Sequence, residues 1–205
     1  MNFIEEYKKG QAGKNKGLYM GDGLSNISKF INGVQRHRIY GIASPPKVGK
    51  STFCDFGFVI QPFLYCLENG IPIEWKYYSF EIDRVSKEFD FATYFLFHDY
   101  DIRQVQLPEG ITVKGESIIN LSPDYLRGRL TDDNDNIITV KDEIFEVLTR
   151  VYSDRIIPLF GEHSDNGILI KPGLIDFIEQ KDNPTGIYKG LISHAEKSGY
   201  FIKNS

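Results

Sequence analysis

The chain has 205 residues, of which 41% are hydrophobic and 14% aromatic, so it can bury one core and carry an inserted subdomain. Its formal net charge of −4 excludes a globally basic nucleic-acid-binding protein, although a local basic patch is compatible with that charge. No run of residues approaches the length of a membrane span and the polar N-terminus is unlike a signal peptide, so a cytoplasmic protein without membrane association is expected.

Residues 1–20 carry few apolar side chains and several Lys and Gly, which is typical of a flexible N-terminal arm. An arm that packs onto a neighbouring subunit is the alternative. Residues 24–33 then predict a short helix that ends at Gly33, and a strand is expected at 38–43. The apolar side chains on one face of that helix are Leu24, Ile27, Phe30 and Ile31.

Residues 39–52 begin with an apolar, strand-like run and pass through a tight loop into Gly-Lys-Ser-Thr at the start of a helix. This order is that of a P-loop, in which loop amides and a helix N-terminus converge on phosphates. Lys50 is expected to lie against the β- and γ-phosphates of ATP, and the Ser51 hydroxyl to hold Mg²⁺. An ordinary helix start that contains a lysine is the structural alternative. The predicted phosphate-binding residues are Ser44, Pro45, Pro46, Lys47, Val48, Gly49, Lys50, Ser51 and Thr52.

The loop departs from the usual pattern at its first position, where Ser44 replaces a glycine. Because that glycine commonly makes a sharp turn, Ser44 predicts strain or a variant loop geometry. Pro45 and Pro46 can compensate by fixing φ in advance.

The next elements alternate between helix and strand. Residues 53–67 predict an amphipathic helix that Pro62 kinks, and residues 73–80 predict a strand followed by a helix. This order favours a parallel sheet with helical crossovers. Glu81 follows the strand, where a carboxylate can activate water beside a bound nucleotide or be only a solvated edge residue.

Later elements are less regular. Residues 98–140 predict an irregular insertion, with a helix capped by Ser122 and a hairpin turn rather than a calcium loop at 132–135. The remaining predictions are a helix at 142–153, a strand at 155–160, an ambiguous segment at 174–178 and a last helix from Pro184 to about Ser198.

Three segments together resemble the ATPase domain of DnaB-type replicative helicases, most closely the versions encoded by tailed bacteriophages. They are residues 23–35, the loop at 39–53, and Tyr-Tyr-Ser-Phe-Glu at 77–81, so the resemblance covers residues 21–83. It implies a three-layer, RecA-like α/β core in residues 21–205, with ATP and Mg²⁺ as cofactors. It also implies Lys50 and Ser51 as phosphate and Mg²⁺ contacts, Glu81 as the catalytic base, and a homo-hexamer on single-stranded DNA in the full-length protein.

That family next has an apolar strand ending in Asp, which supports Mg²⁺. No run of four apolar residues followed by Asp occurs after residue 100, and Leu174-Ile175-Asp176 is too short. The arginine finger and the DNA-binding loops lie further downstream in the family. The chain is therefore expected to be the N-terminal part of a longer ATPase, binding nucleotide weakly and hydrolysing it poorly or not at all.

Three other functions stay open. A nucleotide or small-molecule kinase would need an Arg-rich lid, and none is visible in the sequence. A phage DNA-packaging ATPase normally has its glutamate directly after the Asp-ending strand. A non-catalytic nucleotide-binding remnant is the third. Arg84 and Lys87 could face a neighbouring subunit or nucleic acid, although solvated helix residues are the default expectation.

Overall fold

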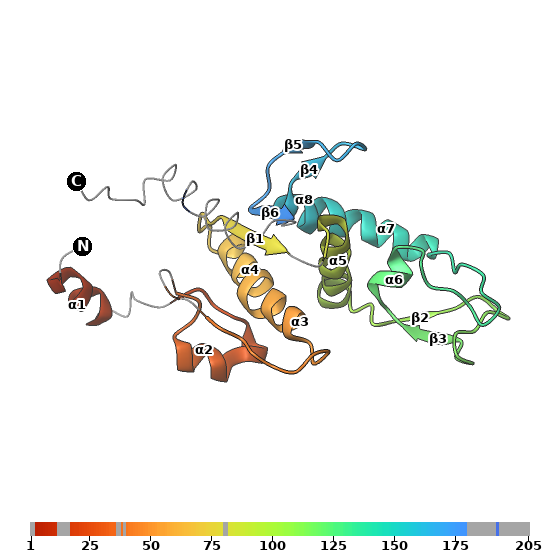
Figure 1. Ribbon diagram of the computed structural model, residues 1–205, viewed down its shortest axis with the longest axis horizontal. Helices are drawn as coiled ribbons and strands as arrows, with labels where there is room; N and C mark the ends of the chain where they lie inside the picture. The colour runs from red at the N-terminus through yellow and green to blue at the C-terminus, as the bar shows by residue number, and fades with distance from the viewer. Residues whose placement is uncertain are drawn as a thin grey trace. The chain divides into compact units, whose positions relative to one another are not determined.

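The computed structural model describes residues 3–11, 17–35, 38, 40–79, 82–179 and 192. The chain divides into two compact units, unit 1 (Met1–Ile73) and unit 2 (Glu74–Ser205). Both contain helices, and the strands form two-stranded sheets, one of them parallel (Figure 1). The α/β class is therefore confirmed. Within the described ranges no larger parallel sheet is present.

Unit 1 begins with a helix where the sequence predicts a flexible arm. Helix α1 spans Phe3–Gln11, and its apolar side chains Phe3 and Tyr7 are exposed. Further along the same segment, Met20 is fully buried and Leu18 pairs with Val34 in an isolated antiparallel bridge. Residues 3–11 are thus helical and Met20 belongs to the core of unit 1, while the flexibility of the arm stays a prediction.

The predicted short helix is confirmed as α2 (Ser25–Ile31), which follows a 3₁₀ turn at Asp22–Leu24. Asn32 and Gly33 end it in the left-handed conformation. Its expected apolar face is not buried, since Phe30 is 90% exposed. The periodicity identified the helix correctly but not what the helix packs against.

The helix after the loop is also confirmed. It runs without a break through α3 (Lys50–Cys54), a π-helical segment (Asp55–Ile60) and α4 (Gln61–Glu68). Pro62 lies just after the wider π segment, which accommodates a residue without an N–H group. The residues that it buries are Asp55, Gly57, Val59, Ile60, Pro62, Phe63 and Cys66.

The strand predicted at 38–43 is wrong for the residues that are described there, 38 and 40–43, none of which lies in a strand. A strand is stable only when a partner completes its hydrogen bonds. The parallel pair of this chain instead joins β1 (Trp75–Ser79) to β6 (Ile175–Glu179), both in unit 2.

The segment at 174–178, which the sequence left ambiguous, forms strand β6 and pairs with β1. Trp75 lies opposite Ile175 and Ser79 opposite Glu179, and the rings of Tyr77 and Phe177 stack at 5.2 Å between centroids. Helix α5 (Arg84–Tyr100) follows β1, as predicted.

Residues 98–140 form mostly short, irregular elements, as the sequence predicts. Strand β2 (Gln104–Gln106) pairs antiparallel with β3 (Ile118–Asn120), and Ser122 caps α6 (Pro123–Leu126) as predicted. The predicted turn at 132–135 is present, closed by a bridge between Thr131 and Ile137.

The second long helix overturns the strand predicted at 155–160. Helix α7 (Asp142–Val151) continues through a π-helical segment (Tyr152–Ile156) into α8 (Ile157–Phe160). Pro158 occupies the first turn of α8 and again follows a π segment, so its missing N–H is tolerated in a helix.

After α8, strand β4 (Glu162–His163) pairs antiparallel with β5 (Leu169–Lys171). In the core of unit 2, the rings of Phe91 in α5 and Phe160 in α8 meet edge to face at 5.2 Å between centroids, and both side chains are almost fully buried. The last predicted helix lies outside the described residues except for position 192. No helix in the described ranges is both long enough and apolar enough to cross a membrane.

Candidate phosphate-binding loop

All nine predicted phosphate-binding residues lie in one exposed loop and the first turn of α3, in unit 1. We call residues 44–52 the phosphate loop. Its side chains are exposed except that of Lys50, which is half-buried and begins the helix. The predicted change from loop to helix at Gly49-Lys50 is therefore confirmed.

Two residues of the phosphate loop adopt the left-handed conformation. Lys47 has φ of 62° and Gly49 has φ of 85°, and Gly49 is the N-cap of α3. A Cβ built at Gly49 would meet nothing within 4 Å, so the backbone angle, not space, requires glycine there. Ser44 has no such angle, and the loop turns at Lys47 and Gly49, which is a variant geometry of the kind that the sequence offers as an alternative to strain at Ser44.

The Lys50 side chain reaches back across the phosphate loop. Its Nζ donates hydrogen bonds to the carbonyl oxygens of Ser44, at 3.0 Å, and Pro45, at 3.1 Å. The two hydrogen bonds thus connect the start of the phosphate loop to the first residue of α3. They hold the Lys50 charge beside the exposed backbone of Ser44 and Pro45. Phosphate oxygens are charged acceptors and bind an ammonium group more strongly than neutral carbonyl oxygens do. Lys50 is therefore placed to exchange these bonds for a phosphate.

Tyr40, which the sequence did not single out, holds the segment that leads into the phosphate loop. Its hydroxyl accepts a hydrogen bond from the amide of Gln35 at 3.0 Å and donates one to the carbonyl oxygen of Gly33 at 3.3 Å. Its ring lies 5.3 Å from that of Phe58 in the π-helical segment. A tyrosine in an apolar run carries no sequence signal for this role.

One thiol, that of Cys54, lies in α3 just after the phosphate loop. Burial, together with the charge of Asp55, raises the pKa of the Cys54 thiol above its usual value, so the thiol stays protonated at neutral pH. Cys54 and Cys66 are not joined in a disulfide, as expected for two residues 12 positions apart in one helix.

Glu81, the predicted catalytic base, lies outside the described residues and stays a prediction. Asp176 is the second residue of β6 and contacts Lys76. An Asp that supports Mg²⁺ beside a nucleotide would follow the carboxyl end of a strand. Asp176 lies at the other end, in agreement with its exclusion from that role on sequence grounds.

The default expectation for Arg84 and Lys87 is wrong. Lys87 is only 2% exposed, and its Nζ lies 3.1 Å from an Asp90 carboxylate oxygen. Arg84 contacts the Glu88 carboxylate and lies 3.2 Å from Nδ1 of His163. Both cations are therefore engaged within unit 2 instead of being solvated.

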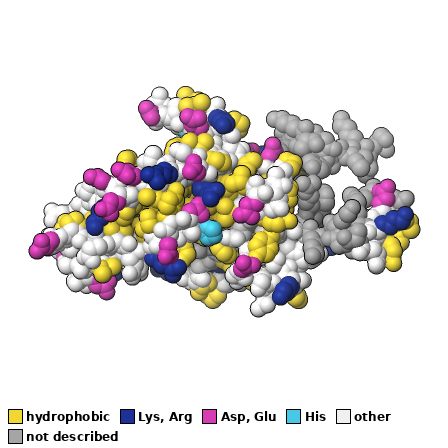
Figure 2. All heavy atoms as spheres, turned by 180° about the vertical axis from the view of Figure 1, so that it is seen from behind, with side chains coloured by type: hydrophobic (Ala, Val, Ile, Leu, Met, Phe, Trp, Pro, Cys, Tyr) yellow, Lys and Arg dark blue, Asp and Glu magenta, His cyan; other side chains and the backbone are white. Residues whose placement is uncertain are grey.

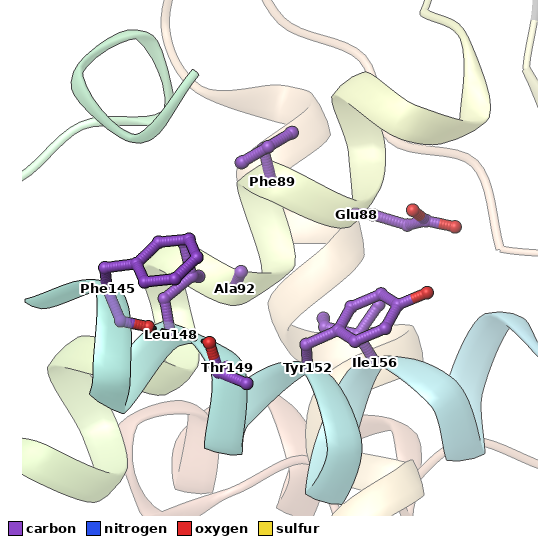
Figure 3. A pocket seen from close by; sticks show the side chains of 8 residues that line it. All are labelled: Glu88, Phe89, Ala92, Phe145, Leu148, Thr149, Tyr152 and Ile156. Carbon is purple, nitrogen blue, oxygen red and sulfur yellow. Dashed lines mark hydrogen bonds between the residues drawn. The ribbon is translucent and has the colours of Figure 1, made fainter. Parts of the chain in front are cut away.

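A separate cavity of about 240 Å³ lies between α5 and α7 in unit 2. Its lining is almost entirely apolar, and in Figure 3 the Glu88 carboxylate and the Tyr152 hydroxyl extend toward the same side. Burial raises the pKa of Glu88, and the nearby Arg84 charge offsets only part of that effect. No motif predicted this cavity. The lining residues are Glu88, Phe89, Ala92, Phe145, Leu148, Thr149, Tyr152 and Ile156.

No protein-family model, curated protein or solved structure matches this chain, so the candidate role of the phosphate loop rests on its own residues and geometry. Figure 2 shows acidic and basic side chains interspersed on the face that it draws. That face carries no extended patch of one charge among the described residues.

Proposed function

We propose that the chain binds ATP with Mg²⁺ through the phosphate loop. We further propose that it is the ATP-binding motor domain of a DnaB-like replicative DNA helicase with a RecA-like core. The supporting observation is the Lys50 ammonium group, which lies across the loop within 3.1 Å of two loop carbonyl oxygens. The motif alone predicts a lysine at this position, but not that its charge reaches over the loop.

The residues present fit a nucleotide phosphate. Gly49 has a left-handed angle and no side chain, so the loop backbone beside Lys50 is accessible. Ser51 and Thr52 follow in the first helical turn with exposed side chains, in reach of a metal bound to the phosphates. Mg²⁺ supplies positive charge that neutralises the β- and γ-phosphates when it is bound.

In this proposal Glu81 activates the water that hydrolyses ATP. Hydrolysis drives movement on single-stranded DNA, and the full-length protein acts as a homo-hexamer in the cytoplasm. These parts of the proposal rest on the resemblance of residues 21–83.

A second candidate function is nucleotide binding without efficient hydrolysis. The observation that favours it is the position of Asp176, at the start of β6 and in contact with Lys76. No other Asp in the described residues follows an apolar strand of the length that supports Mg²⁺ in such motors. Hydrolysis stimulated by single-stranded DNA separates the two candidates.

The proposal is tested by replacing Lys50 and titrating Mg-ATP by calorimetry. Lys50→Ala removes a charge-assisted contact to phosphate, and we expect ATP affinity to fall at least about tenfold, which corresponds to about 1.4 kcal/mol. Lys29→Ala is the matched control, because Lys29 is an exposed lysine of α2 in the same unit. Equal ATP affinity of Lys50→Ala and the wild type would overturn the proposed site.

A further inference from the structure

The segment that leads into the phosphate loop lacks the support that a sheet would provide. Residues 40–43 form no strand. Within the described part of unit 1, no hydrogen bond between two backbone groups joins residues 40–46 to the rest of the unit. The carboxyl end of the phosphate loop is different, because it continues into α3 at Lys50.

The Tyr40 side chain supplies the missing attachment. Its hydroxyl makes two hydrogen bonds to the backbone just after α2, one from the Gln35 amide and one to the Gly33 carbonyl oxygen. Gly33 is itself held, because its amide donates to the Ser28 carbonyl oxygen at 2.9 Å. The hydroxyl therefore connects residues 40–43, which we call the lead-in, to the turn at Gly33 that follows α2.

The ring of Tyr40 connects the lead-in to the helix that begins at Lys50. It packs against Phe58, and Phe58 meets Phe53 edge to face at 6.3 Å between centroids. Phe53 lies in α3, and its amide donates to the Gly49 carbonyl oxygen. The Tyr40 side chain is thus linked to both ends of the phosphate loop. It precedes the loop in the chain, and it contacts the helix after the loop through Phe58 and Phe53.

We propose that Tyr40 is a positioning residue for ATP binding, which rests on the proposed function of the phosphate loop. Tyr40 sets where Ser44 and Pro45 lie relative to Lys50. The Lys50 ammonium group bonds to the carbonyl oxygens of those two residues, so their placement determines where its charge is held. A loop that is already ordered loses less conformational entropy when it binds a ligand.

The test compares two variants that each lose one phenol hydroxyl. Tyr40→Phe keeps the ring contact with Phe58 and removes both hydrogen bonds. Tyr65→Phe is the matched control in unit 1, because the Tyr65 ring packs 6.1 Å from that of Tyr19 and its hydroxyl makes no hydrogen bond within the described ranges. Mg-ATP affinity is measured by calorimetry and backbone order by amide hydrogen exchange, each on the full chain.

We expect Tyr40→Phe to weaken Mg-ATP binding about fivefold, because part of the free energy lost with the two hydrogen bonds is felt at the phosphate loop, and Tyr65→Phe to leave binding unchanged. Without nucleotide, the Gln35 amide should exchange faster in Tyr40→Phe, because it loses the hydroxyl that accepts its hydrogen bond. The amides of α4 should exchange as in the wild type. A merely structural role of Tyr40 would instead lower protection in α4 as well and overturn the proposal.

The two readouts separate the possible failures. Wild-type protein that does not bind Mg-ATP would refute the proposed function and, with it, the role of Tyr40 in binding. Wild-type binding together with full affinity in Tyr40→Phe would refute the positioning role alone. Unchanged exchange at the Gln35 amide would refute the anchoring of the lead-in, whatever the nucleotide result.

Discussion

Gly49 and Lys47 determine the path of the phosphate loop at the scale of single residues. Both have left-handed backbone angles, which an L-residue with a side chain adopts at a cost of roughly 1–2 kcal/mol. Lys47 therefore introduces strain that Gly49 avoids. Non-glycine residues with such angles occur often at ligand sites, where the surrounding structure maintains them.

A pair of glycine substitutions isolates the effect of the Gly49 angle. A Cβ built at Gly49 or at Gly41 meets nothing within 4 Å, but only Gly49 has a left-handed φ. We expect Gly49→Ala to weaken Mg-ATP binding about fivefold to thirtyfold, since about 1–2 kcal/mol of strain opposes the bound geometry. Gly41→Ala should leave the affinity within about twofold, because its backbone angle suits alanine.

Titration of both variants with Mg-ATP measures this difference. Equal affinities for Gly49→Ala and Gly41→Ala would show that the left-handed turn before Lys50 has no part in nucleotide binding.

At the scale of elements, both long helices change to a wider winding just before a proline. A π-helical segment precedes Pro62 in unit 1, and another precedes Pro158 in unit 2. Proline lacks an N–H and its ring clashes with the preceding turn, so a regular α-helix would be broken there. The wider segment relieves this conflict. For the same reason, Pro158 is compatible with the helix that replaces the predicted strand at 155–160.

Helix α5 begins with a side-chain cap that depends on charge. Asp83 accepts hydrogen bonds from the Ser86 amide at 2.8 Å and from the Ser86 hydroxyl at 2.5 Å. These bonds, the hydroxyl bond first, hold the pKa of Asp83 below its usual value of 3.8. A lowered pKa in the folded state means that the ionised carboxylate stabilises unit 2.

The cap predicts a pH dependence of stability. The stabilisation by Asp83 is fully present above pH 3.8 and is lost as the pH falls through the lower pKa of the folded state. We expect Asp83→Ala to lower the free energy of unfolding by about 1 kcal/mol near pH 7, and this difference to shrink below pH 3.8.

Urea unfolding followed by tryptophan fluorescence measures this effect in unit 2, because Trp75 in β1 is the chain's one tryptophan. Asp83→Asn is the control, since its amide oxygen still caps the helix but does not titrate. A difference between wild type and Asp83→Ala that stays constant down to about pH 2 would contradict the charge-dependent cap.

At the scale of the whole molecule, the residues proposed for the motor fall in two different units of the chain. The phosphate loop belongs to unit 1, and position 81 falls within the bounds of unit 2. A measurement of nucleotide binding therefore tests the phosphate loop in unit 1, whereas a measurement of ATP hydrolysis also tests the proposed role of Glu81.

We expect the chain to hydrolyse ATP slowly and single-stranded DNA to accelerate that hydrolysis. Glu81→Gln should lower the rate at least about a hundredfold, the scale of lost base catalysis, and leave Mg-ATP affinity within about twofold. Glu74→Gln removes an exposed carboxylate just before β1 and is the control. Phosphate release measured with and without single-stranded DNA gives the rates.

A wild-type rate in Glu81→Gln would refute Glu81 as the base. ATP binding without measurable hydrolysis in the wild type would favour the non-catalytic candidate.

By itself, the sequence determined the features that neighbouring residues control. The helix start at Lys50, the cap at Ser122 and the turn at 132–135 follow from local backbone preferences and short-range hydrogen bonds, and all are confirmed. Helical periodicity over several turns likewise identified α2 and α5.

Only the tertiary structure decided which segments pair and which side chains are buried. Residues 40–43 have the pattern of a strand but pair with no strand among the described residues, while β1 pairs with β6 far along the chain. Likewise, Lys87 is buried and Phe30 is exposed, against the usual preference of both residue types. The physical reason is the same in each case, because strand pairing and burial depend on residues distant in the sequence, which local patterns do not specify.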